Sequence, residues 1–338
     1  KKDVLNTFLY KYFNDEIEEQ YIPQFIDTFK NEITAINKIV DLEEERNSKE
    51  FNKYKGFLDN DKIRGFISEK LNDKVYSISY LEGYAKCPYY FQLHDFFKVE
   101  EMEREAEDFD NFDIGSIYHE VLHHYYKKYK DQLLDNINDN LLIDNIYNKL
   151  KSFIKKDIQR IKESKDNILP WEFEYEFGRD TPLLIQTSYG DVRFRGKIDR
   201  IDKSIDNDKY VVIDYKSSPY GKRDLDSIEK GLSLQLPVYI MSQESRDVIA
   251  GVYSILSNGE YYNAIGVLGE ASFITKRQKG SVEREDWDNT LEKTKDIIGN
   301  IVREINNGNF SVNPLECTPF CPYKDICRYE NIDEGADE

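Results

Sequence analysis

Gly196-Lys-Ile-Asp-Arg-Ile-Asp202 and Tyr210-Val-Val-Ile-Asp-Tyr-Lys216, joined by a polar turn, decide the fold of this chain. The second segment starts as an apolar, β-branched run, which predicts a buried strand. Side chains alternate between the two faces of a strand, so Asp214 and Lys216 should share one face. In the first segment, Asp199 falls where the predicted strand runs out. We therefore expect two acids and a lysine at the ends of adjacent strands, beside an apolar core.

Two interpretations of these polar residues compete. A lone D-x-K is more often a strand-end salt bridge than a functional site. Asp and Lys are, however, rarely buried unless they are paired or bound to a metal, and carboxylate oxygen is the ligand that hard cations prefer. The context, G-x-x-D-R-x-D followed by a turn and a strand that ends in D-Y-K, favours a metal site.

Composition limits the functions that this chain can have. Its 338 residues suffice for one large domain or two and for a substantial core. The net charge of −18 counts against a nucleic-acid enzyme, because phosphate binding usually leaves a basic footprint. Metal ions at the scissile phosphate, or a local basic channel, would supply the missing positive charge.

Location and redox chemistry follow from two further features. No apolar run is long enough to span a bilayer and no secretory signal is present, so we expect no membrane association. The four cysteines are unevenly placed, which indicates a cytoplasmic chain whose thiols serve a metal and not a disulfide framework. The chain begins with Lys1 and not with Met, so we expect either a fragment of a longer protein or a trimmed chain.

The patterns divide the chain into three parts. Residues 1–75 read as charged helices without a catalytic pattern. Residues 76–330 mix helix and strand patterns and contain every candidate site residue, so we predict an α/β domain with a central mixed sheet flanked by helices. Residues 331–338 form an acidic tail.

A helix should open the second part. Ser79 with Glu82 three residues later is a capping box, which predicts a helix from about Tyr80. Cys87 falls near the end of this helix, and Pro88 marks a break. On its own, a cysteine in such an aromatic setting is most often a small buried hydrophobe.

A second helix carries His119-Glu120-Val121-Leu122-His123, a complete H-E-x-x-H match. In zinc peptidases the two histidines bind zinc and the Glu is the base. No third ligand follows in the extended H-E-x-x-H-x-x-G-x-x-H form. A zinc peptidase remains one alternative function. For His123 and His124, the other interpretation is that they are ordinary surface or core histidines.

The remaining elements follow from periodicity. From Trp171 to Phe177 the large apolar side chains alternate with Glu172, Glu174 and Glu176, which predicts a strand with one apolar face. Gln235 and Tyr239 should face the same way on a helix that begins at about Ser227 and bends at its proline. The other predicted elements are strands Leu183–Ser188, Val192–Ile201, Val248–Leu256 and Ala264–Thr275, and a helix Asp286–Asn306.

Cys317, Cys321 and Cys327 lie close together in a Pro-containing stretch at the end of the chain. Such spacing is typical of a metal site. With Cys87 they provide four thiolate ligands, which suits zinc or a four-iron cluster. Four independent thiols are the alternative.

The order of these motifs resembles the PD-(D/E)xK nuclease superfamily, and within it the RecB-like nuclease domains. The resemblance extends from Tyr76 to Tyr329. It implies that Asp199 and Asp214 bind Mg²⁺, with Mn²⁺ able to substitute, for phosphodiester hydrolysis. It also implies that Lys216 orients or activates the attacking water.

Three further motifs extend the implied site. The family's G-x-x-x-H fits Gly115 to His119 and makes His119 a metal ligand, together with the main-chain carbonyl of Tyr215. Its E-x-x-F-G fits Glu174 to Gly178 and adds Glu174 as a catalytic candidate. Its Q-x-x-x-Y fits Gln235 and Tyr239, which the resemblance places close to the active site.

The cysteine layout resembles the iron–sulfur nucleases of the AddB type and the CRISPR-associated iron–sulfur exonucleases. It implies a [4Fe–4S] cluster, a staple that joins the C-terminal cysteines to the helix ending at Cys87. One difference is the first gap, which is C-x3-C here and C-x2-C in the AddB pattern. The last gap, C-x5-C, agrees.

The resemblance implies an exonuclease or endonuclease that processes DNA ends, single-stranded ends in particular, for recombinational repair. It would be the nuclease domain of an AddB-like helicase–nuclease, or a free-standing relative of such a domain. The chain contains no P-loop motif, so any helicase motor should lie upstream or in an AddA-like partner. A DNA-binding module that keeps the fold without cutting is a further alternative.

Overall fold

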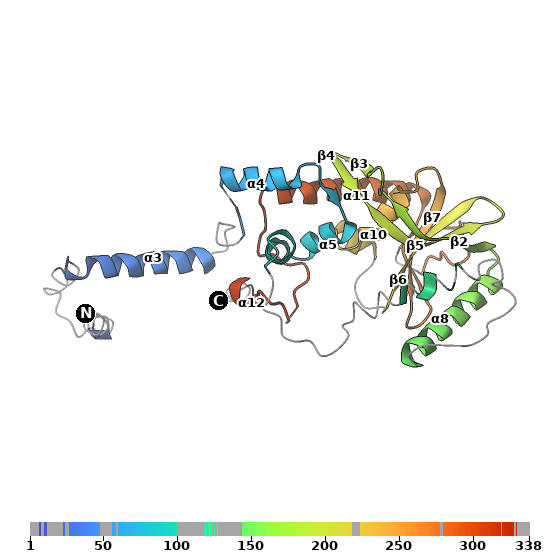
Figure 1. Ribbon diagram of the computed structural model, residues 1–338, viewed down its shortest axis with the longest axis horizontal. Helices are drawn as coiled ribbons and strands as arrows, with labels where there is room; N and C mark the ends of the chain where they lie inside the picture. The colour runs from blue at the N-terminus through green and yellow to red at the C-terminus, as the bar shows by residue number, and fades with distance from the viewer. Residues whose placement is uncertain are drawn as a thin grey trace.

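Figure 1 shows a computed structural model of the chain, in which a twisted sheet carries helices on both faces. The helices are α3 (Lys30–Asn47), α4 (Asp61–Leu71), α5 (Ile78–Lys86), α6 (Pro88–Phe91), the π-helical turn η3 (Gln92–Phe96), α8 (Asp144–Glu163), α9 (Leu225–Glu229), α10 (Gln235–Met241), α11 (Arg284–Asn306) and α12 (Lys324–Cys327). The residues that the structure describes are 7, 10, 11, 23, 27–47, 56–58, 60–99, 118, 119, 121–123, 125, 127, 144–217, 224–277, 280–318, 320–327 and 329.

The main sheet has six strands in the order β2-β5-β6-β7-β8-β9. They are β2 (Ile168–Phe177), β5 (Gly196–Ser204), β6 (Lys209–Lys216), β7 (Asp247–Ile255), β8 (Tyr261–Val267) and β9 (Ser281–Val282). The pairs β6–β7 and β8–β9 are parallel and the other pairs are antiparallel. The predicted α/β class with a mixed sheet flanked by helices is thereby confirmed.

Two apolar cores lie on opposite faces of this sheet. The α8 side holds Val211, Ile213 and Tyr215 of β6, whereas Tyr210 and Val212 of the same strand pack on the side of α5, α10 and α11. Figure 1 shows the same arrangement, with α8 on one side of the sheet and the other three helices on the opposite side. Because β6 is buried on both faces, its sequence is a continuous apolar run.

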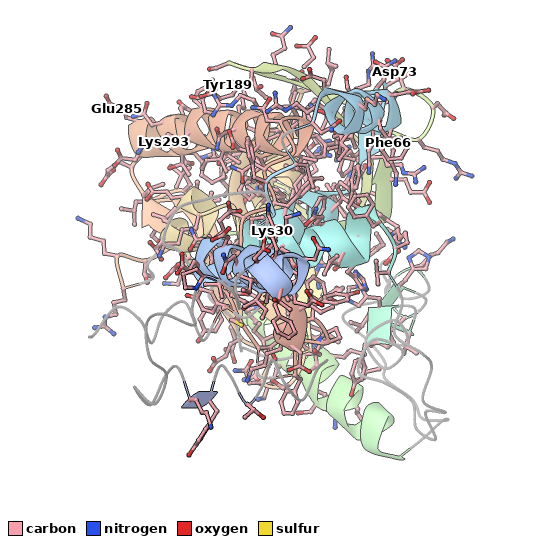
Figure 2. The ribbon with its side chains drawn as sticks, turned by 90° about the vertical axis from the view of Figure 1, so that its left-hand side faces the viewer. Lys30, Phe66, Asp73, Tyr189, Glu285 and Lys293 are labelled. Atoms are coloured by element: carbon pink, nitrogen blue, oxygen red, sulfur yellow. The ribbon has the colours of Figure 1, made fainter. Side chains whose placement is uncertain are left out.

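A long helix covers the second core. The buried positions of α11 include Trp287, Ile298 and Ile305, which lie at helical spacing. Figure 2 shows Glu285 and Lys293 of the same helix on the outside of the molecule. The predicted helix Asp286–Asn306 is confirmed, and so is strand Val248–Leu256, which corresponds to β7.

A second, three-stranded sheet adjoins the first in the order β1-β4-β3, with β1 (Val75–Tyr76), β3 (Leu183–Thr187) and β4 (Gly190–Phe194). The prediction of one strand from Val192 to Ile201 was wrong. The chain leaves the small sheet after Phe194 and enters the main sheet at Gly196. A Cβ at Gly196 would lie 2.6 Å from the ring of Phe177, so a larger residue at this crossing between sheets would have to displace that ring.

Two predicted helices differ in the structure. α5 begins at Ile78 with Ser77 as its N-cap, so the capping box from Ser79 to Glu82 does not form. The helix predicted from about Ser227 is two short helices, α9 and α10, separated by a turn in which Gly231 has a φ of +74°. Pro237 does not bend a helix, because it lies in the first turn of α10, where its missing N–H costs nothing.

Other predictions meet the structure only in part. Strand Ala264–Thr275 is shorter than predicted, because β8 ends at Val267 and turns follow. In the region 1–75, the described residues include α3 and α4, and α3 stands apart from the sheet in Figure 1. The tail 331–338 and Gly115 lie outside the described residues. Among the helices of the described ranges, none combines the length and apolarity needed to cross a membrane.

Candidate active site

The two predicted acids lie where β5 and β6 meet. The last residues paired between these antiparallel strands are Arg200 and Ile213, so Asp199 and Asp214 come next on either side. Both carboxylates are buried, with Asp214 only 2% exposed. As predicted, Asp214 and Lys216 share the face toward α10, whereas the Tyr215 ring enters the opposite core. The sheet therefore places two acids and a lysine at one edge.

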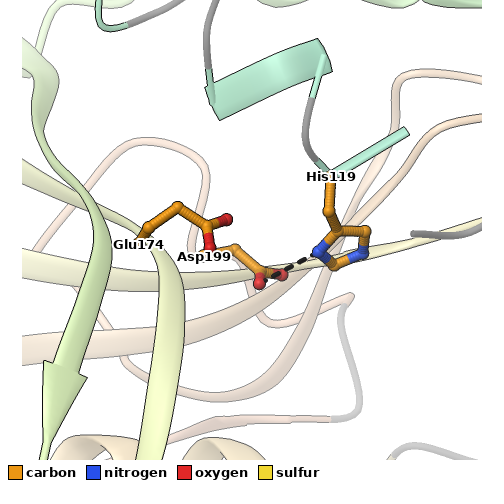
Figure 3. Close-up of side chains that lie close together, drawn as sticks. All are labelled: His119, Glu174 and Asp199. Atoms are coloured by element: carbon orange, nitrogen blue, oxygen red, sulfur yellow. Dashed lines mark hydrogen bonds and ion pairs between the residues drawn. The ribbon is translucent and has the colours of Figure 1, made fainter. Parts of the chain in front are cut away.

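A first group of possible metal ligands consists of His119, Glu174 and Asp199, shown in Figure 3. One ligand atom from each lies within 4.8 Å of those of the other two. His119 Nδ1 lies 3.1 Å from Asp199 Oδ1, and Asp199 Oδ2 accepts a hydrogen bond of 2.7 Å from the Tyr215 main-chain N–H. In the described part of the chain, His119 is thus grouped with two carboxylates and not with His123, its partner in the zinc-peptidase alternative.

Glu174 reaches this group because the regular alternation of side chains between the two faces of β2 is interrupted at that residue. Glu174 has a φ of +51°, a left-handed conformation that is unusual inside a strand. On either side of it, Phe173 packs in the α8 core and Tyr175 packs in the α11 core. The prediction that the large side chains from Trp171 to Phe177 share one face was therefore wrong. The change of face turns the Glu174 carboxylate toward Asp199 and also lets it pair with Lys197.

A second group connects Asp214, Lys216, Gln235 and Tyr239. The Gln235 side-chain amide donates hydrogen bonds of 2.6 Å to Asp214 Oδ1 and 2.8 Å to the Tyr239 hydroxyl. Its carbonyl oxygen accepts a hydrogen bond of 2.8 Å from Lys216 Nζ. Lys216 Nζ also lies 2.5 Å from Asp214 Oδ2. Gln235 is therefore in direct contact with both D-x-K residues, and Tyr239 joins the group through Gln235.

The electrostatics of the site reflect the burial and the mutual proximity of its carboxylates. Burial and the nearby Asp199 carboxylate raise the pKa of Asp214 to about 6, against the opposing effect of Lys216. Burial disfavours a charged His119, but Asp199, Asp214 and Glu174 outweigh this and raise its pKa. Three carboxylates thus lie against one imidazole and two ammonium groups, those of Lys216 and Lys197. A cation bound at Asp214 would favour the ionised form of this buried carboxyl.

The donor set fits a hard divalent cation. Asp214 Oδ2 is buried and, apart from its ion pair with Lys216, has no hydrogen-bond partner among the described residues, so that it keeps a lone pair for another ligand. Carboxylate oxygens with one imidazole nitrogen suit Mg²⁺ and Mn²⁺. Glu174, His119 and Asp199 face one another, and Asp214 lies beside them on the neighbouring strand. The Tyr215 carbonyl, also predicted as a ligand, belongs to the same end of β6.

A buried arginine that was not among the predicted site residues supports this site. Arg200 is completely buried and donates two hydrogen bonds, of 2.5 and 2.6 Å, to the Asp202 carboxylate. It also donates one of 2.7 Å to Asp157 of α8 and one of 3.4 Å to the Tyr215 hydroxyl. The D-R-x-D motif could have predicted this burial. An arginine that has acids nearby in a strand bordered by apolar residues has a partner for its charge. Arg200 fixes β5 to α8 directly after Asp199.

The four cysteines line one cavity of about 220 Å³, with Tyr89, Tyr90 and Tyr323 among its walls. Burial raises the pKa of Cys87, and the proximity of Cys321 and Cys327 adds to this effect. Two main-chain N–H groups of the C-terminal segment, those of Leu315 and Glu316, donate to the carbonyl of Lys86. The structure therefore brings together cysteines that are far apart in sequence.

A mixed sheet with carboxylates and a D-x-K lysine at one edge is the arrangement of a metal-dependent nuclease core. The family model for the PD-(D/E)XK nuclease superfamily matches residues 75–328. The chain therefore belongs to this superfamily, whose nucleases use divalent metal ions.

Individual relatives have names that are more specific than the superfamily. One subunit of the ATP-dependent helicase/deoxyribonuclease of Thermoanaerobacter sp. (strain X514) is 23% identical over 81% of this chain and 31% of its own length. The protein of the same name from Clostridium perfringens (strain SM101 / Type A) is 26% identical over 59% of this chain and 20% of its own length. This chain thus spans less than a third of the curated relatives it matches. The solved structure of SSO0001 aligns over 79% of this chain and 94% of its own, with 14% identity and a TM-score of 0.33.

Proposed function

We propose that this chain is a Mg²⁺-dependent deoxyribonuclease, with Mn²⁺ able to replace Mg²⁺. The observation that carries the proposal is the meeting of two groups at one sheet edge. His119, Glu174 and Asp199 form one group, and Asp214 with Lys216 belongs to the other. The match to the superfamily favours this function over a zinc peptidase.

Each residue has a role that its contacts support. His119, Glu174, Asp199 and Asp214 would hold the cation, which when bound stabilises developing phosphoryl charge and makes bound water more acidic. Lys216, held between Asp214 and Gln235, orients the attacking water. One water is consumed for each bond cut. Its oxygen bonds to phosphorus as the bond to the departing sugar oxygen breaks. One of its protons ends on that oxygen, and the other stays on the new phosphate group or leaves to solvent.

The test compares the wild type with Asp214→Ala on end-labelled DNA in the presence of Mg²⁺ or Mn²⁺. We expect the variant to lose cleavage by orders of magnitude, because it lacks a ligand and the partner of Lys216. Asp191→Ala is the matched control, since Asp191 is an exposed acid on β4. Cleavage by Asp214→Ala at the wild-type rate would refute the assignment.

We also propose that the cysteine cavity holds a [4Fe–4S] cluster on Cys87, Cys317, Cys321 and Cys327. Four thiols around one cavity, in a region where the C-terminal segment already bonds to Lys86, support this. Iron and sulfide should be assayed together on protein purified without oxygen. About four irons with four sulfides would support the cluster, whereas zinc without sulfide would keep the connection between the two ends and exclude iron–sulfur chemistry.

The physiological role is proposed from the relatives. Their names describe one subunit of an ATP-dependent helicase/deoxyribonuclease. We infer that this chain processes DNA ends, mainly single-stranded ones, in the cytoplasm during recombinational repair, with a helicase as partner. Cleavage of matched single- and double-stranded substrates, labelled at either end and assayed without ATP, tests the strand preference. Equal cleavage of both forms would contradict it.

A further inference from the structure

A partly buried acid outside the predicted site holds the start of α10. One oxygen of Glu82, Oε1, accepts hydrogen bonds of 2.7 Å from the Leu234 N–H and 3.1 Å from the Gln235 N–H. The first N–H groups of a helix have no partner within the helix and need external acceptors. Leu234, the N-cap of α10, has no side chain that can accept, so Glu82 of α5 takes the role that an Asp or Ser usually has.

The residue that Glu82 holds is the one that joins the two halves of the D-x-K pair. Gln235 donates to Asp214 Oδ1 and accepts from Lys216 Nζ. Its side-chain oxygen and nitrogen are thereby both engaged in the site, while its main-chain N–H is engaged by Glu82. Displacement of the α10 start would move both contacts at once.

Glu82 is itself presented from a well-anchored helix. Tyr84 of α5 donates a hydrogen bond of 2.6 Å from its hydroxyl to the carbonyl of Asn309. The carbonyl of Lys86, the last residue of α5, accepts the N–H groups of Leu315 and Glu316 at 2.8 and 3.2 Å. The position of the Glu82 carboxylate is thus fixed by contacts that are independent of α10.

From these contacts we propose that Glu82 is a positioning residue of the active site. It sets the place of Gln235, and through Gln235 the geometry of Asp214 and Lys216. Its hydrogen bonds go to Leu234 and Gln235, and its charge acts on Lys216 only through space. The kinetic part of this inference rests on the proposed nuclease function; the structural part does not.

The experiment uses three variants of the full chain. Glu82→Ala removes the acceptor, Glu82→Gln keeps one side-chain oxygen that can accept both bonds, and Glu82→Asp withdraws the carboxylate by one methylene in case the alanine variant does not fold. Asn60→Ala is the matched control. Asn60 Oδ1 also accepts two main-chain N–H groups, those of Lys62 and Ile63, at the start of α4.

The first measurement is amide hydrogen exchange, which needs no activity. Glu82→Ala, or Glu82→Asp in its place, should speed exchange at Leu234 and Gln235 about tenfold, because one net hydrogen bond is lost at each amide. Glu82→Gln should restore most of the protection. Unchanged exchange at these amides in the alanine or aspartate variant would overturn the proposal, whatever the enzymatic result.

The second measurement separates the chemical step from binding. Glu82→Ala should lower the single-turnover cleavage rate about ten- to a hundredfold while DNA affinity changes less than about twofold, with Glu82→Gln close to the wild type. Asn60→Ala should lower the melting temperature to a similar extent and leave the rate unchanged. An equal loss of rate in Asn60→Ala would show general destabilisation and refute positioning. If the wild type itself does not cut DNA, the proposed function fails, and hydrogen exchange alone decides the role of Glu82.

Discussion

Replacing Asp214 by asparagine should stabilise the metal-free protein relative to the wild type, and this gain should be larger at neutral pH than at acid pH. In the folded protein, burial and Asp199 raise the pKa of Asp214 from its ordinary 3.8 to about 6. The folded state therefore binds more protons than the unfolded state between these two values, and stability falls as the pH rises through that window. A change from 3.8 to about 6 corresponds to about 3 kcal/mol. The contribution of Asp214 is fully present below about pH 4 and is lost above about pH 6.

The assay is denaturant unfolding of wild type and Asp214→Asn in the presence of a chelator, at a series of pH values from about 4 to about 8. The quantity of interest is the difference in free energy of unfolding between the two proteins, in which titrating groups that do not interact with Asp214 cancel. We expect the free energy of unfolding of Asp214→Asn, relative to that of the wild type, to rise by about 3 kcal/mol from the acid end of this range to the neutral end.

Divalent metal provides the second arm of the same experiment. A cation that binds the folded site stabilises it by mass action, and it does so through the ionised carboxylate. Excess Mn²⁺ should therefore stabilise the wild type at pH 7 and have a much smaller effect on Asp214→Asn. If the difference in stability between the two proteins does not depend on pH, Asp214 does not have a raised pKa. If both proteins respond equally to Mn²⁺, Asp214 is not a metal ligand.

Three further substitutions test other parts of the site. Lys216→Ala should lower the single-turnover rate by orders of magnitude at nearly constant DNA affinity, measured by rapid quench and by binding at low temperature without metal; a collapse of binding would make Lys216 a phosphate anchor. Cys87→Ala should lower the melting temperature and speed proteolysis at the C-terminal end, whereas four independent thiols would give a small effect only. Arg200→Met should destabilise the fold by about 3–5 kcal/mol in denaturant unfolding, because it leaves the buried carboxylates of Asp157 and Asp202 without their shared guanidinium group. A loss below about 1 kcal/mol would mean that this network contributes little.

Much of the sheet edge could be predicted because its residues are local in sequence. Asp214, Tyr215 and Lys216 obey strand alternation, since β6 is regular and buried on both faces. The match of Gln235 to Tyr239 survived although the helix prediction around it was wrong, because four residues span one turn in a short helix as well as in a long one.

The missed features depend on contacts that sequence spacing does not encode. Glu82 has the correct spacing for a capping box with Ser79, yet its carboxylate caps a helix more than 150 residues away. A local sequence pattern indicates a possible hydrogen-bond partner, but it does not show whether a residue distant in sequence takes that place. Glu174 shows the same limit for the backbone, because nothing in an alternating strand sequence marks the single residue at which φ becomes positive.

The left-handed conformation of Glu174 has a consequence for directed evolution. Among the described non-glycine residues with positive φ, Glu174 alone lies inside a strand, where such backbone costs about 1–2 kcal/mol. A library randomised at this position and sorted for thermal resistance alone should enrich glycine, which adopts that conformation freely. The same library sorted for metal-dependent cutting should retain the acid. The two selections should diverge at position 174, where the chain gives up some robustness to aim one carboxylate.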